Sequence, residues 1–255
     1  MSTTLLPAEQ ALIDPIDTAE VVSFLQALIR ARSDYPPGDT RAVISVVAEK
    51  LASAGIESRL LARRGQQVSL IAELSGNKTG PTLLFHAHAD TVGAGNADAW
   101  TRDAFGGEVV DGNIYGRGAG DDKGSLAAQV MAAVALARAG VRLNGCLQLA
   151  AVADEESGGL FGTRWLRDSG QLQPDYLVVG EQASNQVAIA ERVACGIDLT
   201  VFGKSAHGAT PWEGENAIMQ AAQALSWLQV RLFPRLAQRT HPFLPPPSLN
   251  VGKIS

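Results

Sequence analysis

Histidine and carboxylate side chains gather in four short clusters along the chain. The clusters are His86-Ala-His88-Ala-Asp90, Asp121-Asp122, Asp154-Glu155-Glu156 and Glu181, and each falls where a predicted strand ends. Ligands of an open α/β sheet bind beyond the carboxyl ends of its strands, so we expect the clusters to converge on one crevice. Acidic groups that meet at one point repel each other unless a cation neutralises them. Imidazole and carboxylate ligands without a nearby thiolate favour zinc, cobalt or manganese.

Each cluster taken alone also has an ordinary structural interpretation. A His-x-Asp pair is usually a hydrogen bond at a strand end, and Asp121-Asp122 ahead of a helix is typical of an N-terminal cap. Asp154-Glu155-Glu156 fits a solvated acidic loop, and Glu181 fits an ion pair with a surface arginine. The occurrence of all four clusters, each at a strand end, favours the metal site.

The elements that must position these side chains alternate between helices and strands. Apolar spacing predicts helices over about 21–28, 40–54 and 126–139, and apolar runs predict strands at 57–62, 67–74, 81–87, 147–153 and 176–180. The last two runs are apolar throughout, which is typical of strands buried on both faces. The alternation predicts an α/β domain over residues 1–185, with its sheet covered by helices on both sides.

The pattern changes near residue 185. Residues 186–193 and 196–203 are predicted to form paired strands, and a helix is predicted over about 215–232. A one-sided sheet with a helix on it is a small α+β unit, so residues 186–255 are predicted to form a second domain. The final residues, VGKIS, are interpreted as a strand separated from its sheet.

Composition excludes several classes of protein. The chain has 255 residues, a net charge of −5 and 46% hydrophobic residues, which argues against a disordered chain. Without a dense block of Lys and Arg, we expect no nucleic-acid partner. No apolar run is long enough to cross a bilayer, and the first residues do not have the pattern of a secretory signal, so we expect no membrane partner. Two cysteines cannot build a disulfide framework, which favours free thiols in a reducing cytoplasm.

Five segments, taken together, are similar to a known enzyme family. They are LLFHAHADTVGAG, NIYGRGAGDDKGSLAA, VADEESGG, VVGEQAS and GKSAHGATPWEGENAI, and they extend from Leu83 to Ile218. The set resembles the family of acetylornithine deacetylase, succinyl-diaminopimelate desuccinylase, aminoacylase and carboxypeptidase G, which are two-metal amide hydrolases. The resemblance implies a catalytic α/β domain with a mixed sheet and a smaller α+β lid domain, through which the protein would form a homodimer.

The resemblance also implies the metal ligands. His88 and Glu181 match ligands of the first metal, Asp121 matches the carboxylate that bridges both metals, and Glu156 matches a ligand of the second. The implied cofactor is Zn²⁺, two ions per active site in a full-length chain, with Co²⁺ or Mn²⁺ as alternatives. Asp90 matches the carboxylate that orients the His88 imidazole.

Two further residues carry the implied chemistry. Glu155 matches the general base, which would take a proton from a water bridging the metals and return it to the leaving amine. His207 matches the lid histidine that reaches a neighbouring subunit's site and stabilises the oxyanion. The implied function is hydrolysis of amide bonds in N-acyl amino acids or small peptides. The alternative is a non-catalytic dimerisation scaffold with a partial metal site, although a scaffold has no need of Glu155.

The sequence departs from the family pattern at the second metal. That metal takes a histidine from a late segment, whereas this sequence offers only His86, His88, His207 and His241. We interpret His86 as a core or supporting residue and His241 as a surface loop residue. We therefore expect both domains to be incomplete at the C-terminus, as in a fragment; a naturally truncated, poorly active product is the alternative.

Overall fold

The structure is a computed structural model that describes residues 5–76 and 80–255. It consists of two compact units, Met1–Ser184 and Asn185–Ser255. The units are described separately below, the first as far as its described residues extend.

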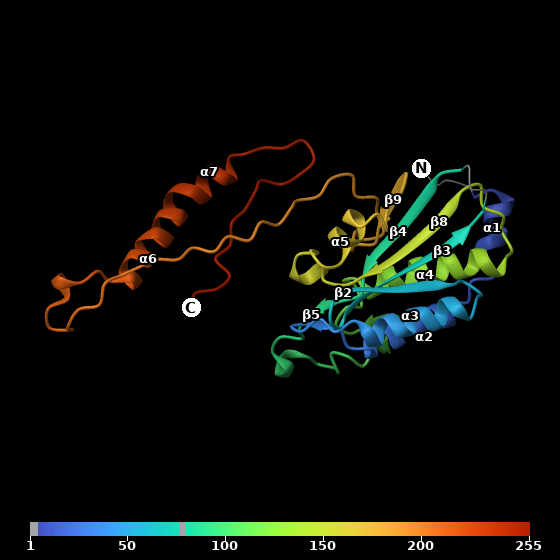
Figure 1. Ribbon diagram of the computed structural model, residues 1–255, viewed down its shortest axis with the longest axis horizontal. Coiled ribbons are helices and arrows are strands. Elements are labelled where there is room, and N and C mark those ends of the chain that lie inside the picture. The colour runs from blue at the N-terminus through green and yellow to red at the C-terminus, as the bar shows by residue number, and fades with distance from the viewer. Residues whose placement is uncertain (1–4, 77–79) are drawn as a thin grey trace. The chain divides into compact units, whose positions relative to one another are not determined.

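A five-stranded mixed sheet forms the centre of the first unit (Figure 1). Its strands, in spatial order, are β2 (Ser58–Arg64), β3 (Gln67–Ser75), β8 (Cys146–Val152), β4 (Thr82–His88) and β9 (Tyr176–Val179). Strands β8, β4 and β9 are parallel, and β3 is antiparallel to both of its neighbours. Phe85 of β4 pairs with Leu149 of β8 and with Val178 of β9. The predicted α/β class with a mixed sheet is confirmed.

Three helices form a layer on one face of this sheet, in which α3 and α4 contact the strands and α2 packs on those two helices (Figure 1). They are α2 (Thr18–Arg30), α3 (Arg41–Ala52) and α4 (Lys123–Arg138), and α1 (Pro7–Ile13) contacts α4. The Asp17 side chain accepts a hydrogen bond from the Ala19 N–H and so caps α2. Leu28, Val47 and Val130 are buried in one core cluster with the strand residues Leu70 and Leu149. Burial of these side chains drives the helices onto the sheet.

The opposite face of the sheet is covered by the short helix α5 (Thr163–Asp168). Leu166 of α5 is buried in a second cluster with Ile71, Leu84 and Val152. Along β3, Leu70 belongs to the first cluster and Ile71 to the second, as the two-residue period of a strand requires. The predicted covering of both faces by helices is confirmed.

Several short elements of the first unit carry no clear sequence signal. Strand β1 (Asp34–Tyr35) pairs in parallel with β5 (Thr91–Val92), and β6 (Glu108–Val110) pairs with β7 (Asn113–Tyr115) as a hairpin. Single 3-10 turns η1 (Ala97–Ala99) and η2 (Glu155–Ser157) complete the unit. Strands of two or three residues are too short for an alternating pattern to emerge.

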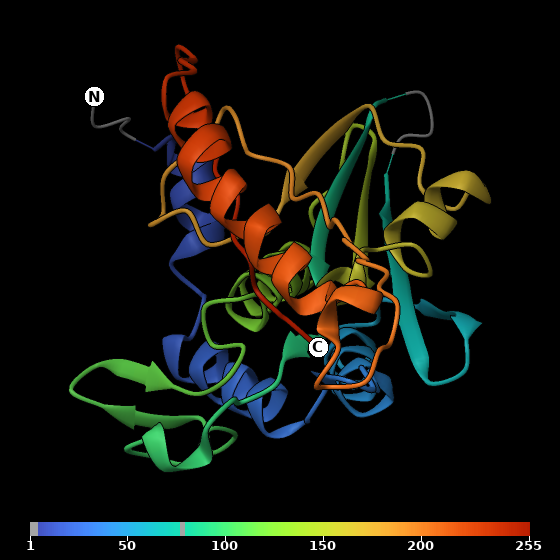
Figure 2. The ribbon, with the colours of Figure 1, turned by 90° about the vertical axis from the view of Figure 1, so that its left-hand side faces the viewer.

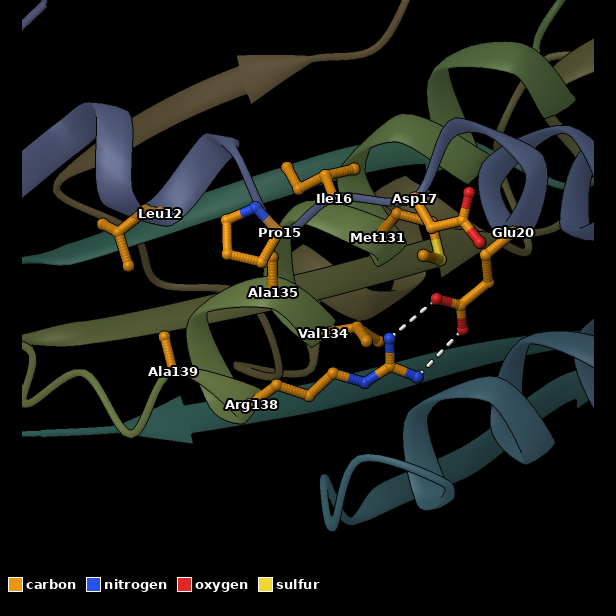
Figure 3. Close-up of a pocket in the computed structure, with 10 residues that line it drawn as sticks. All are labelled: Leu12, Pro15, Ile16, Asp17, Glu20, Met131, Val134, Ala135, Arg138 and Ala139. Carbon is orange, nitrogen blue, oxygen red and sulfur yellow. Dashed lines mark hydrogen bonds and ion pairs between the residues drawn. The ribbon is translucent and has the colours of Figure 1, made fainter.

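A cavity of about 190 Å³ lies on the helical side of the unit (Figure 3). It is lined by α1, α2, α4 and the linker between the first two helices, with Leu12, Ile16 and Val134 among its apolar residues. The Arg138 guanidinium bonds both carboxylate oxygens of Glu20 at its border, at 2.7 and 2.9 Å. None of the lining residues belongs to the four clusters.

The second unit is helical where the structure assigns regular elements (Figure 2). Its elements are the 3-10 turn η3 (Pro211–Glu213), α6 (Ala217–Trp227), the π-helical turn η4 (Leu228–Leu232) and α7 (Phe233–Ala237). The helix predicted over 215–232 is therefore present and continues to Ala237. Asn216 begins α6 by accepting hydrogen bonds from the N–H groups of Ile218 and Met219.

The predicted strand pair 186–193 and 196–203 is wrong. Neither segment is in a strand, and the one bridge in the described part of this unit joins Lys204 to Glu215. Val187, Val193 and Phe202 are 91%, 88% and 82% exposed. An isolated pair of strands is marginal in water without an apolar layer to cover it, and these segments have none. The residues VGKIS are also outside any strand.

Within the described ranges, none of the helices combines the length and the apolar character that crossing a membrane requires. Cys146 and Cys195 are both free thiols, as predicted.

Candidate metal centre

Three of the four clusters lie together at the carboxyl ends of the strands, because these strands are parallel. His88 is the last residue of β4, Asp154-Glu155-Glu156 follows β8, and Glu181 follows β9. Neighbouring parallel strands run in the same direction, so the carboxyl ends of β4, β8 and β9 lie side by side. Asp121 reaches these strand ends from the residues ahead of α4, and its Oδ1 lies 2.9 Å from His88 Nε2.

His88, Asp121 and Glu181 form the first group of potential metal ligands. One ligand atom from each lies within 4.8 Å of the others. His88 Nε2 is 2.9 Å from Asp121 Oδ1 and 3.8 Å from Glu181 Oε1. The His88 side chain is 2% exposed, whereas those of Asp121 and Glu181 are 44% and 43% exposed. The imidazole of the group is thus buried in the protein, whereas its two carboxylates are open to solvent.

His88, Glu155 and Glu156 form a second group with the same 4.8 Å spacing. Glu156 is half-buried, and its Oε1 accepts a hydrogen bond from the Val92 N–H at 2.9 Å. Glu155 is exposed, so its carboxylate faces solvent beside the cluster. The two neighbours differ in environment, as a division between a ligand and a base would require.

Asp90 contacts the Glu155-Glu156 turn through its side chain and His88 through its backbone. His88 Nδ1 lies 2.9 Å from the carbonyl oxygen of Asp90, while the nearest carboxylate oxygen is 3.8 Å away. The carboxylate instead accepts the N–H groups of Glu155 and Glu156 at 3.2 and 3.1 Å. The structure thus differs from the expected carboxylate–imidazole contact, because a buried carboxylate is satisfied best by several N–H donors.

Asp122 takes a position that the cap interpretation did not predict. It stands at the N-cap of α4, but its side chain makes no capping hydrogen bond. Its Oδ2 accepts the N–H of His88 at 3.1 Å, and the residue is fully buried. Burial raises the pKa of Asp122 to about 7. Asp122 therefore supports the strand end that carries the imidazole.

The charges of the cluster shift its own pKa values. Burial raises the pKa of Glu156 and of Glu181 above the ordinary value, and the negative charge of Asp121 raises both further. Burial lowers the pKa of His88, but the charges of Asp122, Asp90 and Glu155 outweigh it and raise the pKa overall. Mutual repulsion of this kind is relieved by a cation. One imidazole with several carboxylates is a donor set that fits zinc or a neighbouring divalent metal.

The remaining histidines lie away from these groups or in the other unit. His86 Nε2 lies 2.9 Å from the Thr163 hydroxyl, and burial lowers the pKa of this histidine to about 4, which agrees with the predicted core or supporting position. His207 is exposed in a turn of the second unit, where its Nδ1 accepts the Ala209 N–H at 3.2 Å. His241 is exposed outside any helix or strand, as expected of a surface loop residue.

Lys123 is a buried cation behind the cluster that sequence reasoning missed. It is fully buried, and its Nζ donates a hydrogen bond to the Ala31 carbonyl at 2.9 Å. Burial lowers the pKa of Lys123 to about 8. It joins the start of α4 to the end of α2. No signal in a single sequence predicts it, because lysine is rarely buried completely.

The family pattern described as "Peptidase family M20/M25/M40" matches residues 84–234. A succinyl-diaminopimelate desuccinylase of Bordetella petrii is 33% identical over 243 residues, which are 92% of this chain and 61% of that protein. The same enzyme of Methylobacterium radiotolerans is 36% identical over 207 residues, 76% of this chain and 51% of that protein. The chain thus spans about half to three fifths of the length of these two relatives.

Solved structures show the same fold. The M20 family metallo-carboxypeptidase Sso-CP2 from Sulfolobus solfataricus aligns with a TM-score of 0.66 and 19% identity, over 89% of this chain and 55% of that one. Human carnosine dipeptidase 1 aligns with a TM-score of 0.56 and 25% identity, over 64% of this chain and 38% of that one. The family pattern covers more than half of the sequence and includes His88, Asp121, Glu156 and Glu181. The chain therefore belongs to peptidase family M20/M25/M40.

Proposed function

We propose that the chain carries the metal-binding and base-bearing part of a hydrolase that cleaves amide bonds in N-acyl amino acids or small peptides. The observation that carries this proposal is the meeting of His88, Asp121 and Glu181 within 4.8 Å, from segments far apart in the sequence. Membership of the family and the names of the relatives, desuccinylases and peptidases, support the same reaction class.

The proposed ligands divide between two ions. His88, Asp121 and Glu181, which lie together, would hold the first. By the family resemblance, Asp121 and Glu156 would hold the second. Zinc, cobalt or manganese bound there supplies Lewis acidity, which polarises an amide carbonyl and lowers the pKa of water. Asp122 and Asp90 hold the backbone of His88 and of the Glu155-Glu156 turn, and so orient three of the proposed functional side chains.

The proton transfers fall to Glu155. Its exposed carboxylate is free to accept a proton from the attacking water and to return it to the leaving amine. His207 would donate a hydrogen bond to the developing oxyanion of the substrate in a neighbouring subunit. This role requires a homodimer formed through the second unit, and we include that dimer and a cytoplasmic location in the proposal.

The substrate class is drawn from the relatives. Those described above are named for removal of a succinyl group from diaminopimelate, which favours N-succinyl amino acids as the first substrates to test. A solved neighbour named as a dipeptidase favours dipeptides as the second set. An N-acetyl amino acid completes a panel that separates deacylase from peptidase activity.

A Glu155→Gln substitution tests the mechanism. In the full-length protein we expect the variant to bind as much zinc or cobalt as the unsubstituted form but to lose at least about 100-fold in kcat, because the amide cannot accept the proton. Metal content is measured after gel filtration, and hydrolysis of the panel is measured with added metal and with a chelator. Glu57→Gln, the same change at an exposed position, serves as the control and should leave both values unchanged.

Two results would contradict the proposal. Undiminished kcat in Glu155→Gln would remove Glu155 as the base. Absence of metal-dependent hydrolysis of every acyl-amino acid and dipeptide by the full-length protein would remove the hydrolase function itself and favour the scaffold.

A further inference from the structure

Asp154 places a buried carboxylate directly beneath the turn that carries Glu155 and Glu156. It follows the last buried residues of β8 and is 2% exposed. Glu155 is exposed and Glu156 half-buried, whereas the buried Asp154 side chain is hydrogen-bonded to three groups of the protein. A buried carboxylate that has no cation beside it needs several hydrogen-bond donors to offset the cost of its burial. The donors of Asp154 therefore identify the segments that it holds together.

The contacts of Asp154 join both ends of the turn to a neighbouring strand. One carboxylate oxygen, Oδ2, accepts the Phe161 N–H at 2.7 Å. The other, Oδ1, accepts the Ser157 hydroxyl and lies 3.3 Å from the donor Nε2 of Gln67, the first residue of β3. Gln67 is itself buried, with 5% of its surface exposed. The side chain thus ties residues 157 and 161 to the sheet.

The backbone of Asp154 also helps to fix the turn 154–161. Its φ angle is +72°, in the left-handed region, and its carbonyl oxygen accepts the Gly159 N–H at 2.6 Å. A non-glycine residue keeps this conformation only where its surroundings hold it. On the opposite side of the turn, the Asp90 carboxylate accepts the N–H groups of Glu155 and Glu156. The two glutamates are therefore held between two buried carboxylates.

We propose that Asp154 is a positioning residue: through Phe161, Ser157 and Gln67 it fixes the turn 154–161 and so sets the direction in which Glu155 and Glu156 point. This inference rests on the proposed function for its catalytic part, since it assigns Glu155 and Glu156 the roles of base and ligand. Its structural part, the fixing of the turn, does not depend on that function. A base displaced by about 1 Å can lose on the order of 100-fold in rate, so the turn needs such a support.

Asp154→Asn tests the support with little change of shape. Asparagine tolerates the left-handed region as well as aspartate, so the backbone is not strained. Its amide has one acceptor oxygen and no charge, so the charge-assisted contacts of both carboxylate oxygens with Phe161, Ser157 and Gln67 are replaced by fewer and weaker neutral ones. The control is Asp111→Asn, which makes the same change at an exposed turn with φ +49°.

The first measurement is hydrogen exchange of the chelator-treated chain, read at residues 155–161. In Asp154→Asn we expect exchange at Gly159 and Phe161 to accelerate at least about tenfold, with β4 and α4 unchanged. Asp111→Asn should match the unsubstituted chain throughout. Unchanged exchange in the turn, or acceleration spread evenly over the first unit, would overturn the proposal. If Asp154→Asn does not fold, Gln67→Leu removes one donor to the same carboxylate and should accelerate the same amides by a smaller factor.

The second measurement is steady-state kinetics of the full-length protein on the substrate panel with added metal. We expect Asp154→Asn to lower kcat at least about tenfold and to leave KM within about twofold, because the support acts on the base rather than on substrate binding. A change in KM as large as the change in kcat, or an unchanged kcat, would contradict the positioning role. If the full-length protein turns over no substrate, the proposed function fails, and hydrogen exchange alone decides whether Asp154 fixes the turn.

Discussion

At the scale of single residues, the carboxylates of the candidate site divide into those that face the cluster and those that hold the backbone. Asp121, Glu156 and Glu181 were predicted from the sequence, and the structure brings each near His88. Asp90 and Asp122 accept the backbone N–H groups of the site residues themselves, and Glu156 has both roles because its Oε1 also accepts the Val92 N–H. A sequence reveals which residue types follow a strand, but not which atom of each contacts its neighbour. The family resemblance therefore implied a contact between the Asp90 carboxylate and the His88 imidazole, whereas in the structure the Asp90 carbonyl oxygen makes that contact.

The backbone at the end of the Asp154 turn also limits what side chain can follow it. A Cβ added at Gly162 would lie 1.8 Å from the Ala153 carbonyl oxygen, far inside van der Waals contact. We expect Gly162→Ala to lower the free energy of unfolding by about 2–3 kcal/mol, the cost of overpacking against rigid backbone. Urea denaturation followed by circular dichroism measures this. Gly196→Ala, where a Cβ meets nothing within 4 Å, should change stability by less than about 0.5 kcal/mol. Equal effects of the two changes would refute the argument.

At the scale of elements, long apolar runs were predictable and short elements were not. The run 81–87 corresponds to Thr82–His88 and the run 147–153 to Cys146–Val152, because buried strands need continuous apolar side chains. The pairs β1–β5 and β6–β7 were missed, since two or three residues give no period. Residues 186–203 alternate as strands do, but alternation cannot supply the neighbouring strands that a sheet needs.

Glu20 joins three helices and makes the helical layer sensitive to acid. Its carboxylate on α2 bonds Arg138 of α4 at 2.7 Å and Lys50 of α3 at 3.1 Å, and these two cations hold its pKa at about 2, below the ordinary 4.5. A lowered pKa in the folded state stabilises the fold fully above pH 4.5 and loses that contribution as pH falls toward 2.

We therefore expect Glu20→Gln to lower the free energy of unfolding at pH 7 by about 1 kcal/mol, a value reduced for solvent screening. The difference from the unsubstituted chain should shrink between pH 4.5 and 2, and also at high salt. Thermal unfolding across that pH range checks this, with Glu57→Gln as the control. A difference that stays constant down to pH 2 would rule out the ion pairs as its cause.

At the scale of the whole first unit, the two edges of the sheet differ in their protection. Edge strand β2 (Ser58–Arg64) carries three arginines, which discourage pairing with another sheet. Edge strand β9 (Tyr176–Val179) has four exposed apolar residues and no charge, with Tyr176 at 65% and Val178 at 46% exposure. The strand predicted at 176–180 is confirmed, but its predicted burial on both faces is wrong, because β9 lies at the edge of the sheet and its four residues are exposed. The place of a strand in a sheet depends on contacts between distant segments, which one sequence does not reveal.

We expect the isolated chain to self-associate through β9 as its concentration rises. Val178→Lys should shift sedimentation velocity profiles toward the monomer, because a lysine on an apolar edge opposes strand addition. Leu60→Lys, on the arginine-bearing strand β2, is the matched control and should leave the profile as it was. A profile unaffected by Val178→Lys would place the association elsewhere.

The meeting of residues at the carboxyl ends of the parallel strands has one more consequence. His88 and Asp121 are separated by 33 positions, and Glu181 follows another strand. An ion bound by all three would therefore act as a clasp, that is, a cross-link that closes long loops of the chain. Such a clasp removes conformations chiefly from the unfolded chain, as a cross-link does. The free energy of holding the ion would then be, in large part, free energy of keeping this side of the protein folded.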